Sequence, residues 1–265
     1  MIQGGYVVWL LFRWFMVWGL LLWTPAPRLA PGLGVGINPK AQFGGSVLAV
    51  ELLNPPYWHN WGQPNSEQFV TDPRFMPLMK RCCFLSDAEI TQLAAAYPGR
   101  IWLLLNEPEN PDQDNWTPQD AVAKIKQWRA AIGDNGIFAC CGTIVWQPAL
   151  DWLDEYLRLG GLMPVVWHIH IYGARTGPEW DAILEQWWAW CTSRDVCRPI
   201  IVSETGPGWA TGSPEPLLRY LLAYDDPRVW GTMWFSSVDD EWGRSSLMDA
   251  GGLTALGQIY SAGAQ

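Results

Sequence analysis

Two glutamates directly follow apolar runs of the sequence, a position at which acid–base chemistry is often placed. The run at 101–105 ends in Asn106 and Glu107, and the run at 200–202 is followed within two residues by Glu204. A carboxylate at the end of a buried strand is costly unless it is hydrogen-bonded or used. Either glutamate alone could be an exposed acid that opens a loop, but the repeated pattern favours a shared function.

Strand alternation predicts how the two acids point. Successive side chains of a strand face opposite sides, so Glu107 shares a face with Leu105, and Glu204 shares a face with Val202. Asn106 falls on the face opposite Glu107. Because both residues lie near the strand end, both polar side chains can still bend over the same opening.

Three further polar residues alternate along the segment at 165–172. His168, His170 and Tyr172 share one face, and the chain has only 3 histidines. The two histidines could be core residues satisfied by hydrogen bonds, or metal ligands. Because no third histidine lies nearby in the sequence, we predict no metal site. Polar side chains that end in a tyrosine are more typical of support for a carboxylate.

Tryptophan is unusually common, with 20 residues. Much of it can be core, but such a surplus suggests flat apolar faces that contact a ligand. Alternation places Trp230, Thr232 and Trp234 on one face of the last predicted strand. Trp230 could be a core residue or a platform for a sugar ring, and we expect Trp234 to be a platform.

Two carboxylates accompanied by amides, hydroxyl groups and indoles indicate glycoside hydrolysis. That reaction needs one protonated carboxyl group to donate to the leaving oxygen and one ionised carboxylate to attack the anomeric carbon. Burial and a neighbouring negative charge raise the pKa of the acid, whereas hydrogen bonds keep the nucleophile ionised. The absence of a Gly-x-Ser-x-Gly sequence disfavours a serine hydrolase, and we expect no cofactor.

Strand-like and helix-like segments alternate along the chain, which is typical of a parallel sheet covered by helices. We predict strands at 34–38, 56–61, 75–80, 101–106, 137–142, 165–172, 200–204 and 229–236, and helices at 47–53, 87–97, 117–132, 149–159, 178–191, 215–223 and 253–261. This order predicts a single-domain α/β fold, the (β/α)₈ TIM barrel, with its site at the carboxyl ends of the strands. A doubly wound sheet is the alternative, but its glycine-rich first turn is incomplete here.

The first thirty residues differ from the rest of the chain. Residues 6–23 are apolar apart from Arg13, and this length is at the low end for a membrane span. We expect residues 1–30 to be a signal peptide or membrane anchor and 31–265 to be the catalytic domain. The protein would then be secreted or membrane-anchored and extracellular. A mis-assigned start codon is the alternative.

Charge and cysteine usage restrict the partners and the compartment. The chain has 17 basic and 26 acidic residues and a net charge of −9, so it lacks the basic surface that nucleic acids and anionic lipids attract. Cys191 and Cys197 flank a short polar segment and could form a disulfide in an oxidising compartment. The adjacent Cys140 and Cys141 are expected to be buried free thiols.

The sequence Asn-Glu-Pro at 106–108, together with Ser-Glu-Thr at 203–205, resembles the strand ends of the retaining (β/α)₈ glycoside hydrolases of clan A. The two glutamates are 97 positions apart, which suits three intervening strand–helix units. Within the clan, the chain is most similar to the Asl1-like glycosyl hydrolases, glycoside hydrolase family 128. The known activity of that family is endo-β-1,3-glucanase.

Other segments carry the same resemblance over about 33–260. They are Tyr-Trp-His-Asn-Trp-Gly at 57–62, Phe-Met-Pro-Leu-Met at 75–79, Thr-Pro at 117–118, His-Ile-Tyr at 170–172 and Trp-Phe at 234–235. The chain departs from the family pattern at Lys80-Arg81, at Ile171 and at Ser-Glu-Thr. These differences bear on which glucan linkage is cleaved more than on which reaction is catalysed.

The resemblance implies a role for each candidate residue. Glu107 would be the acid/base and Glu204 the nucleophile. Asn106 would bind the sugar 2-hydroxyl group, Tyr172 would hold Glu204, and His170 would lie near Glu107. The remaining predicted substrate-binding residues are Trp234, as the floor under the sugar, with Asn60, Trp61 and Trp209.

We therefore expect a retaining glycosidase that cleaves a neutral β-linked polysaccharide through a glycosyl-enzyme on Glu204, with endo-β-1,3-glucanase as the leading activity. A possible membrane tether is formed by residues 6–23. The alternatives are a clan A enzyme that acts on xylan, mannan or xylosides, a carbohydrate-binding barrel without activity, and a membrane-anchored scaffold whose tryptophans only pack.

Overall fold

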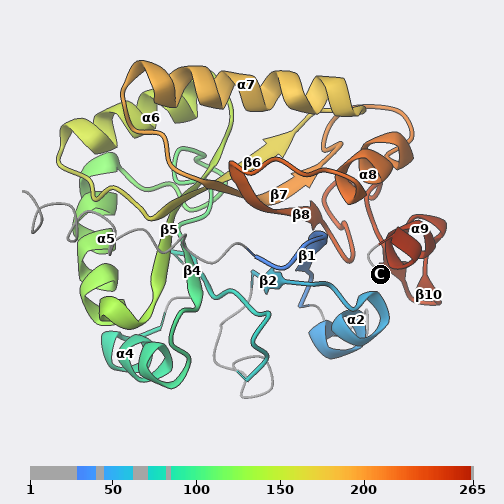
Figure 1. Ribbon diagram of the computed structural model, residues 1–265, viewed down its shortest axis with the longest axis horizontal. Coiled ribbons are helices and arrows are strands. Elements are labelled where there is room, and N and C mark those ends of the chain that lie inside the picture. Colours follow the sequence, from blue (N-terminus) through green and yellow to red (C-terminus); the bar gives the residue numbers. More distant parts are fainter. Residues whose placement is uncertain (1–28, 40–44, 62–70, 82–84, 264–265) are drawn as a thin grey trace, which may run out of the picture.

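Short buried segments of β-branched, aromatic and aliphatic residues form eight parallel strands. The computed structural model describes residues 29–39, 45–61, 71–81 and 85–263. The strands are β1 (Leu33–Ile37), β2 (Trp58–Asn60), β3 (Leu78–Met79), β4 (Ile101–Leu104), β5 (Ile137–Ile144), β6 (Val166–Tyr172), β7 (Ile200–Gly206) and β8 (Val229–Phe235). Their order in the sheet is β2-β1-β8-β7-β6-β5-β4-β3 (Figure 1).

The two edges of this sheet approach each other and nearly close a barrel. A parallel bridge joins Trp58 of β2 to Phe75, three residues before β3. Trp58 donates its backbone N–H to the Arg74 carbonyl at 3.1 Å and accepts from the Met76 N–H at 2.8 Å. The predicted (β/α)₈ barrel is confirmed.

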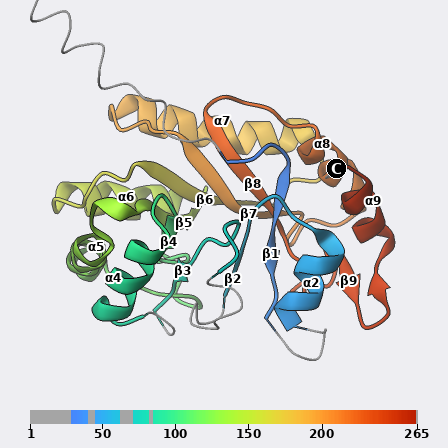
Figure 2. The same ribbon diagram turned by 60° about the horizontal axis from the view of Figure 1, so that its bottom comes forward.

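The helices surround the strands in both ribbon views (Figure 1 and Figure 2). They are α2 (Gly45–Leu53), α4 (Asp87–Ala96), α5 (Pro118–Ile132), α6 (Gln147–Arg158), α7 (Gly177–Ser193), α8 (Glu215–Leu222) and α9 (Ala255–Gly263). Two begin at side-chain caps, since Ser86 accepts from the Glu89 N–H and Thr117 accepts from the Asp120 N–H. The last helix starts later than predicted, because 248–253 forms the short hairpin of β9 (Met248–Asp249) and β10 (Gly252–Leu253).

Two apolar layers fill the molecule. The smaller layer lies inside the barrel and includes Leu103, Ile201 and Trp230, which fixes Trp230 as a core residue. The larger layer packs strands against helices. Seven tryptophans are among the largest fully buried side chains: Trp58, Trp102, Trp128, Trp167, Trp180, Trp187 and Trp234. Most of the tryptophan surplus among the described residues therefore serves packing rather than ligand contact.

The cysteines in the described part of the chain are all paired. Cys191 and Cys197 form the predicted disulfide. The prediction of free thiols at Cys140 and Cys141 is wrong, because these neighbours are bonded to each other. Strand β5 is irregular here, with a register shift toward β6 between Cys141 and Thr143, so the alternation of a regular strand does not hold the two side chains apart.

The predicted signal or anchor lies almost entirely outside the described residues, which begin at Leu29. Within the described part, no helix has the length and apolar character needed to cross a membrane.

Candidate active site

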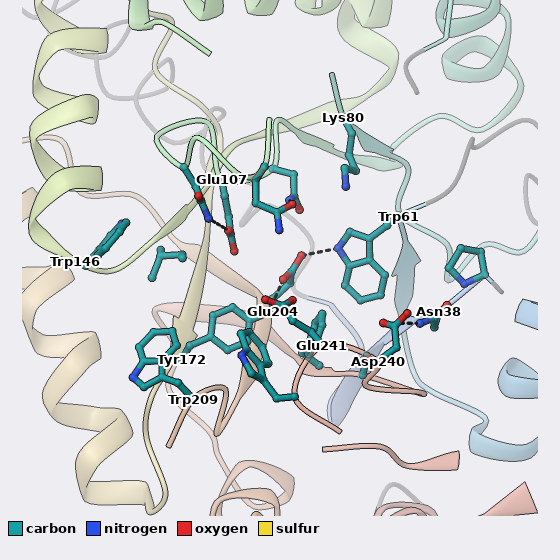
Figure 3. A pocket seen from close by; sticks show the side chains of 18 residues that line it. Asn38, Trp61, Lys80, Glu107, Trp146, Tyr172, Glu204, Trp209, Asp240 and Glu241 are labelled. Atoms are coloured by element: carbon teal, nitrogen blue, oxygen red, sulfur yellow. Dashed lines mark hydrogen bonds between the residues drawn. The ribbon is translucent and has the colours of Figure 1, made fainter. Parts of the chain in front are cut away.

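A cavity of about 460 Å³ opens at the carboxyl ends of the strands. Its walls come from nearly every strand end and following loop (Figure 3). The lining residues are Asn38, Pro39, Trp61, Lys80, Asn106, Glu107, Asn110, Gln113, Ile144, Trp146, Tyr172, Glu204, Trp209, Phe235, Ser236, Asp240, Glu241 and Trp242. Glu107 and Glu204 both line it, so the two acids singled out in the sequence lie in one cavity.

Glu107 reaches the cavity because β4 ends at Leu104, two residues before the predicted end, and the chain then turns. Leu105 and Glu107 have φ values of 70° and 48°, in the left-handed region that side chains rarely adopt. Leu105 therefore joins Leu104 in the outer core instead of alternating with it, and the predicted face shared by Leu105 and Glu107 is wrong. This turn lets both Asn106 and Glu107 line the cavity.

Glu204 reaches the cavity through an irregularity in β7. The register between β7 and β8 shifts between Val202 and Thr205, as in a β-bulge, which re-aims side chains locally. Val202 packs in the outer core, whereas Glu204 lines the cavity. The prediction that Val202 and Glu204 share a face is therefore wrong, although Glu204 lies where the chemistry requires it.

The Glu204 carboxylate accepts two strong hydrogen bonds. The Tyr172 hydroxyl group donates to Oε2 at 2.5 Å, and the Trp61 indole donates to Oε1 at 2.7 Å (Figure 3). Burial raises the pKa of Glu204, while the His170 charge opposes the rise, the Glu107 charge adds to it, and the two hydrogen bonds lower it. The donors from Tyr172 and Trp61 thus favour the ionised form that a nucleophile needs.

The Glu107 carboxyl group is held by neighbours on both oxygens. His170 Nδ1 lies 2.9 Å from Oε1, and the Asn110 amide donates to Oε2 at 2.9 Å. His170 Nδ1 also lies 3.5 Å from Glu204 Oε2, so the imidazole lies between the two acids. Burial by itself would lower the pKa of His170, but Glu204 and Glu107 raise it above its usual value.

Ligand atoms of Glu107, His170 and Glu204 all lie within 4.8 Å of one another. This proximity would also suit a metal ion, and no other described group of three or more such residues has it. However, N–H and O–H donors from Asn110, Tyr172 and Trp61 already occupy oxygens of the two carboxylates. Donors of this kind prepare carboxylates for proton transfer and nucleophilic attack rather than for metal binding.

His168 supports the site from below. Its Nδ1 lies 3.1 Å from the Ser203 hydroxyl group and its Nε2 lies 2.8 Å from the Leu104 carbonyl. Complete burial lowers the pKa of His168 to about 3, so the ring is neutral and ties β4 to β7. The structure thus places His168 in a supporting position, as the sequence pattern predicted.

Asn106 lines the cavity and is held through its backbone by the loop that follows β4. Its backbone N–H donates to Asp114 Oδ2 at 3.0 Å, and Asp114 also accepts from the Arg81 N–H. The side-chain Oδ1 of Asn106 has no partner among the described residues. Asp114 was not singled out in the sequence, because only the loop after β4 brings it under Asn106.

The aromatic floor of the cavity differs from the prediction. Trp234 is fully buried in the outer core and donates its indole N–H to the Ser245 carbonyl at 2.7 Å, so it does not line the cavity. Its neighbour Phe235 does. Tyr172 packs against Phe235 and Trp242 with ring centroids 5.7 and 5.2 Å apart.

Of the other predicted substrate-binding residues, Trp61 and Trp209 line the cavity, and Asn60 does not. Asn60 is buried at the end of β2. Sequence reasoning missed Trp146, Trp242, Asp240 and Glu241. Only their position in the sequence could have pointed to them. They follow the predicted fifth and eighth strands, as Glu107 and Glu204 follow the fourth and seventh.

Comparison with known proteins places this geometry in a family. The family described as "Glycosyl hydrolase catalytic core" matches residues 53–260. None of the curated proteins matches the chain.

Solved structures share the fold at low sequence identity. An endo-β-1,3-glucanase of glycoside hydrolase family 128 from Pseudomonas viridiflava is 19% identical, with a TM-score of 0.65 over 88% of this chain and 98% of that one. One from Amycolatopsis mediterranei, in complex with laminaritriose, is 18% identical, with a TM-score of 0.67 over 88% and 100%. A curdlan-specific exo-β-1,3-glucanase from Blastomyces gilchristii is 16% identical, with a TM-score of 0.65 over 87% and 97%. The expected likeness in fold to family 128 is thereby confirmed.

Proposed function

The chain belongs to the glycosyl hydrolase catalytic core family and is a glycoside hydrolase, and from this premise we propose that it cleaves neutral β-1,3-glucan internally with retention of configuration. One observation carries the proposal. Glu107 from the end of β4 and Glu204 from β7 enter one cavity with carboxylate oxygens no more than 4.8 Å apart. Retaining glycosidases keep their two carboxyl groups about 5–5.5 Å apart, whereas inverting enzymes leave room for a water molecule.

In the proposed first step, Glu204 attacks the anomeric carbon while Glu107 donates its proton to the leaving oxygen. The glycosidic C–O bond breaks and an ester bond forms between the sugar and Glu204. Tyr172 and Trp61 donate to the Glu204 oxygens and orient the carboxylate for attack. Asn106 lines the cavity next to Glu107, where its side-chain amide can bind a sugar hydroxyl group.

In the second step, Glu107 takes a proton from water, which attacks the anomeric carbon and releases Glu204. The change of role has an electrostatic cause. Once Glu204 is esterified, its negative charge no longer lies beside Glu107, so the two acids no longer repel each other and Glu107 can act as a base. His170, which lies between the two carboxyl groups, stabilises the charge that remains.

The relatives support the substrate. The Amycolatopsis enzyme has been crystallised with laminari-oligosaccharides after substitution of either of two glutamates 97 positions apart in its chain, the same separation as between Glu107 and Glu204 here. These relatives include both endo- and exo-glucanases. A cavity open at the strand ends and lined by indoles at its rim supports internal cleavage of a chain.

We further propose that the enzyme acts outside the cell. The bonded pairs Cys140–Cys141 and Cys191–Cys197 support an oxidising compartment, because disulfides rarely persist in a reducing cytosol.

The decisive experiment is a product profile on laminarin, curdlan, xylan and mannan for wild type, Glu107→Ala and Glu204→Ala. We expect laminari-oligosaccharides from the wild type and a loss of at least about 10³-fold in either variant, because each removes a reacting group. Azide should restore Glu204→Ala and yield a glycosyl azide of inverted configuration. Glu155→Ala, which removes an exposed carboxylate on α6, is the matched control.

Each contrary outcome is informative. Cleavage of xylan or mannan in preference to glucan would reject the substrate. Glucan binding without turnover by the wild type would identify a carbohydrate-binding barrel. Activity that survives Glu204→Ala would reject the nucleophile.

A further inference from the structure

Trp146 is one of the few tryptophans that face the cavity. It lies between β5 and α6, and 43% of its surface is exposed, whereas most described tryptophans are buried. Large apolar side chains at a cavity wall are suited to contact a ligand face. An exposed indole contributes little to ligand binding unless its orientation is fixed. The partner of its N–H group therefore determines whether the ring can serve as a stacking surface.

That partner is Glu109, two residues after Glu107 in the same loop. Glu109 Oε1 accepts from the Ile144 backbone N–H at 2.9 Å and from the Trp146 indole at 3.2 Å. The other oxygen, Oε2, is buried and has no partner in the described part of the chain. Burial raises the pKa of Glu109 to about 7. The contact of Oε1 with the Ile144 and Trp146 N–H groups therefore links the loop after β4 to the indole.

The location of Trp146 assigns it to one side of the scissile bond. In Figure 3 Trp146 lies beyond Glu107, and Trp61, which binds Glu204, lies on the opposite side of the pair. The acid/base protonates the oxygen of the departing sugar, and the nucleophile bonds to the retained one. The departing sugar is therefore on the Glu107 side, where Trp146 can stack against its apolar face.

We propose that Glu109 is a positioning residue that fixes the Trp146 indole as a stacking surface for the departing glucose unit. This inference rests on the proposed hydrolase function. It implies that the loop carrying the acid/base also sets the position of the leaving-group site, because Glu107 and Glu109 are two residues apart.

The test uses the same site in reverse. When a glucan acceptor replaces water, it must bind where the departing sugar was, so the ratio of transglycosylation to hydrolysis reports this site alone. Both reactions start from one glycosyl-enzyme, and a general loss of activity leaves their ratio unchanged. We expect Glu109→Ala and Trp146→Ala each to lower the ratio about fivefold, with no further loss in the double variant.

Glu109→Gln is the matched variant, since its amide oxygen can still accept from both N–H groups. We expect it to restore at least half of the wild-type ratio. An unchanged ratio in Glu109→Ala alongside a reduced ratio in Trp146→Ala would overturn the proposal. A ratio in Glu109→Gln as low as in Glu109→Ala would also overturn it.

A second measurement does not depend on activity. In protein labelled with 5-fluorotryptophan, the ¹⁹F resonance of Trp146 is identified by its absence in Trp146→Phe. We expect it to be shifted or broadened in Glu109→Ala and close to wild type in Glu109→Gln. If the wild type cleaves no glucan, the proposed function fails, and this measurement still decides whether Glu109 fixes Trp146: an unperturbed resonance in Glu109→Ala would reject that contact.

Discussion

At the scale of single residues, the site is a balance of charge between two acids and a histidine. Glu204 is fully enclosed, and burial raises its pKa, while Tyr172 and Trp61 lower it by donating hydrogen bonds. His170 lies between Glu204 and Glu107, and its pKa is raised by both. Each donor to Glu204 therefore favours the ionised form of this carboxylate at a position where burial would neutralise it.

Removal of one donor has a predictable effect on pH dependence. A hydrogen bond to an ionised group contributes about 1.5–3 kcal/mol, and Tyr172→Phe removes it from the charged form of Glu204 only. The pKa of Glu204 should rise further, so the acidic limb of the kcat/KM profile should move to higher pH. We also expect kcat to fall by about tenfold or more, as measured on laminarin across pH 4–8.

Tyr156→Phe provides the control for this prediction. Tyr156 also donates a buried hydroxyl group, to the Leu162 carbonyl at 2.9 Å, but it lies on α6 away from the cavity. The substitution Tyr156→Phe should lower the free energy of unfolding without moving the acidic limb of the kcat/KM profile. An acidic limb that stays in place in Tyr172→Phe, or moves to lower pH, would show that this hydroxyl group does not stabilise the Glu204 carboxylate.

At the scale of elements, the end of β5 sets the position of the loop after β4. The Glu107 backbone N–H donates to the Gly142 carbonyl at 2.7 Å. Gly142 has a φ of 67°, and a Cβ atom there would lie 2.7 Å from the Leu105 carbonyl oxygen and 2.8 Å from the His168 ring. The close approach of the two strand ends thus requires a glycine, and the position of Glu107 depends on it.

We expect Gly142→Ala to lower kcat by at least about tenfold and the free energy of unfolding by about 3 kcal/mol. The added methyl group would push the loop that carries Glu107 away from His170. Urea titration and initial rates on laminarin measure the two effects.

Gly160→Ala separates backbone strain from the clash. Gly160 also has a positive φ, of 79°, but nothing lies within 4 Å of an added Cβ atom. The substitution Gly160→Ala should lower the free energy of unfolding by about 1 kcal/mol and leave kcat unchanged. Equal effects of the two substitutions on kcat would contradict a specific role for the contact between β5 and the β4 loop.

At the scale of the whole molecule, the net charge of −9 has a local counterpart in the cavity. Among the described residues, four carboxyl groups line it, from Glu107, Glu204, Asp240 and Glu241, together with the ammonium group of Lys80. Burial raises the pKa of Glu241, and the charges of Glu107 and Glu204 raise it further. The negative field therefore extends from the catalytic pair to the rim.

This field predicts discrimination against anionic glycans. Carboxymethyl-β-1,3-glucan should be cleaved more slowly than hydroxyethyl-β-1,3-glucan of the same degree of substitution, which matches its bulk without the charge. Raising the ionic strength from about 0.01 to 0.5 M shortens the screening length, so the difference in kcat/KM should shrink several-fold. A difference that does not respond to salt would assign the effect to shape rather than to charge.

The amino-acid sequence alone predicts the alternation of strands and helices and the two strand ends near Glu107 and Glu204. These features depend on local propensity and on apolar periodicity, which are properties of neighbouring residues. The same reasoning predicted Tyr172 and His170 as partners of the acids, on the strength of alternation and of the family resemblance.

Tertiary packing, in contrast, sets which side chains face the cavity near the strand ends. The early end of β4 at Leu104, the register shift before Thr205 and the exchange of Trp234 for Phe235 each break alternation. The cause is the fit of each strand against its neighbours in a closing barrel, which adjacent residues do not encode. For the same reason, the contact between Glu109 and Trp146 became visible only when β4 and β5 were placed side by side.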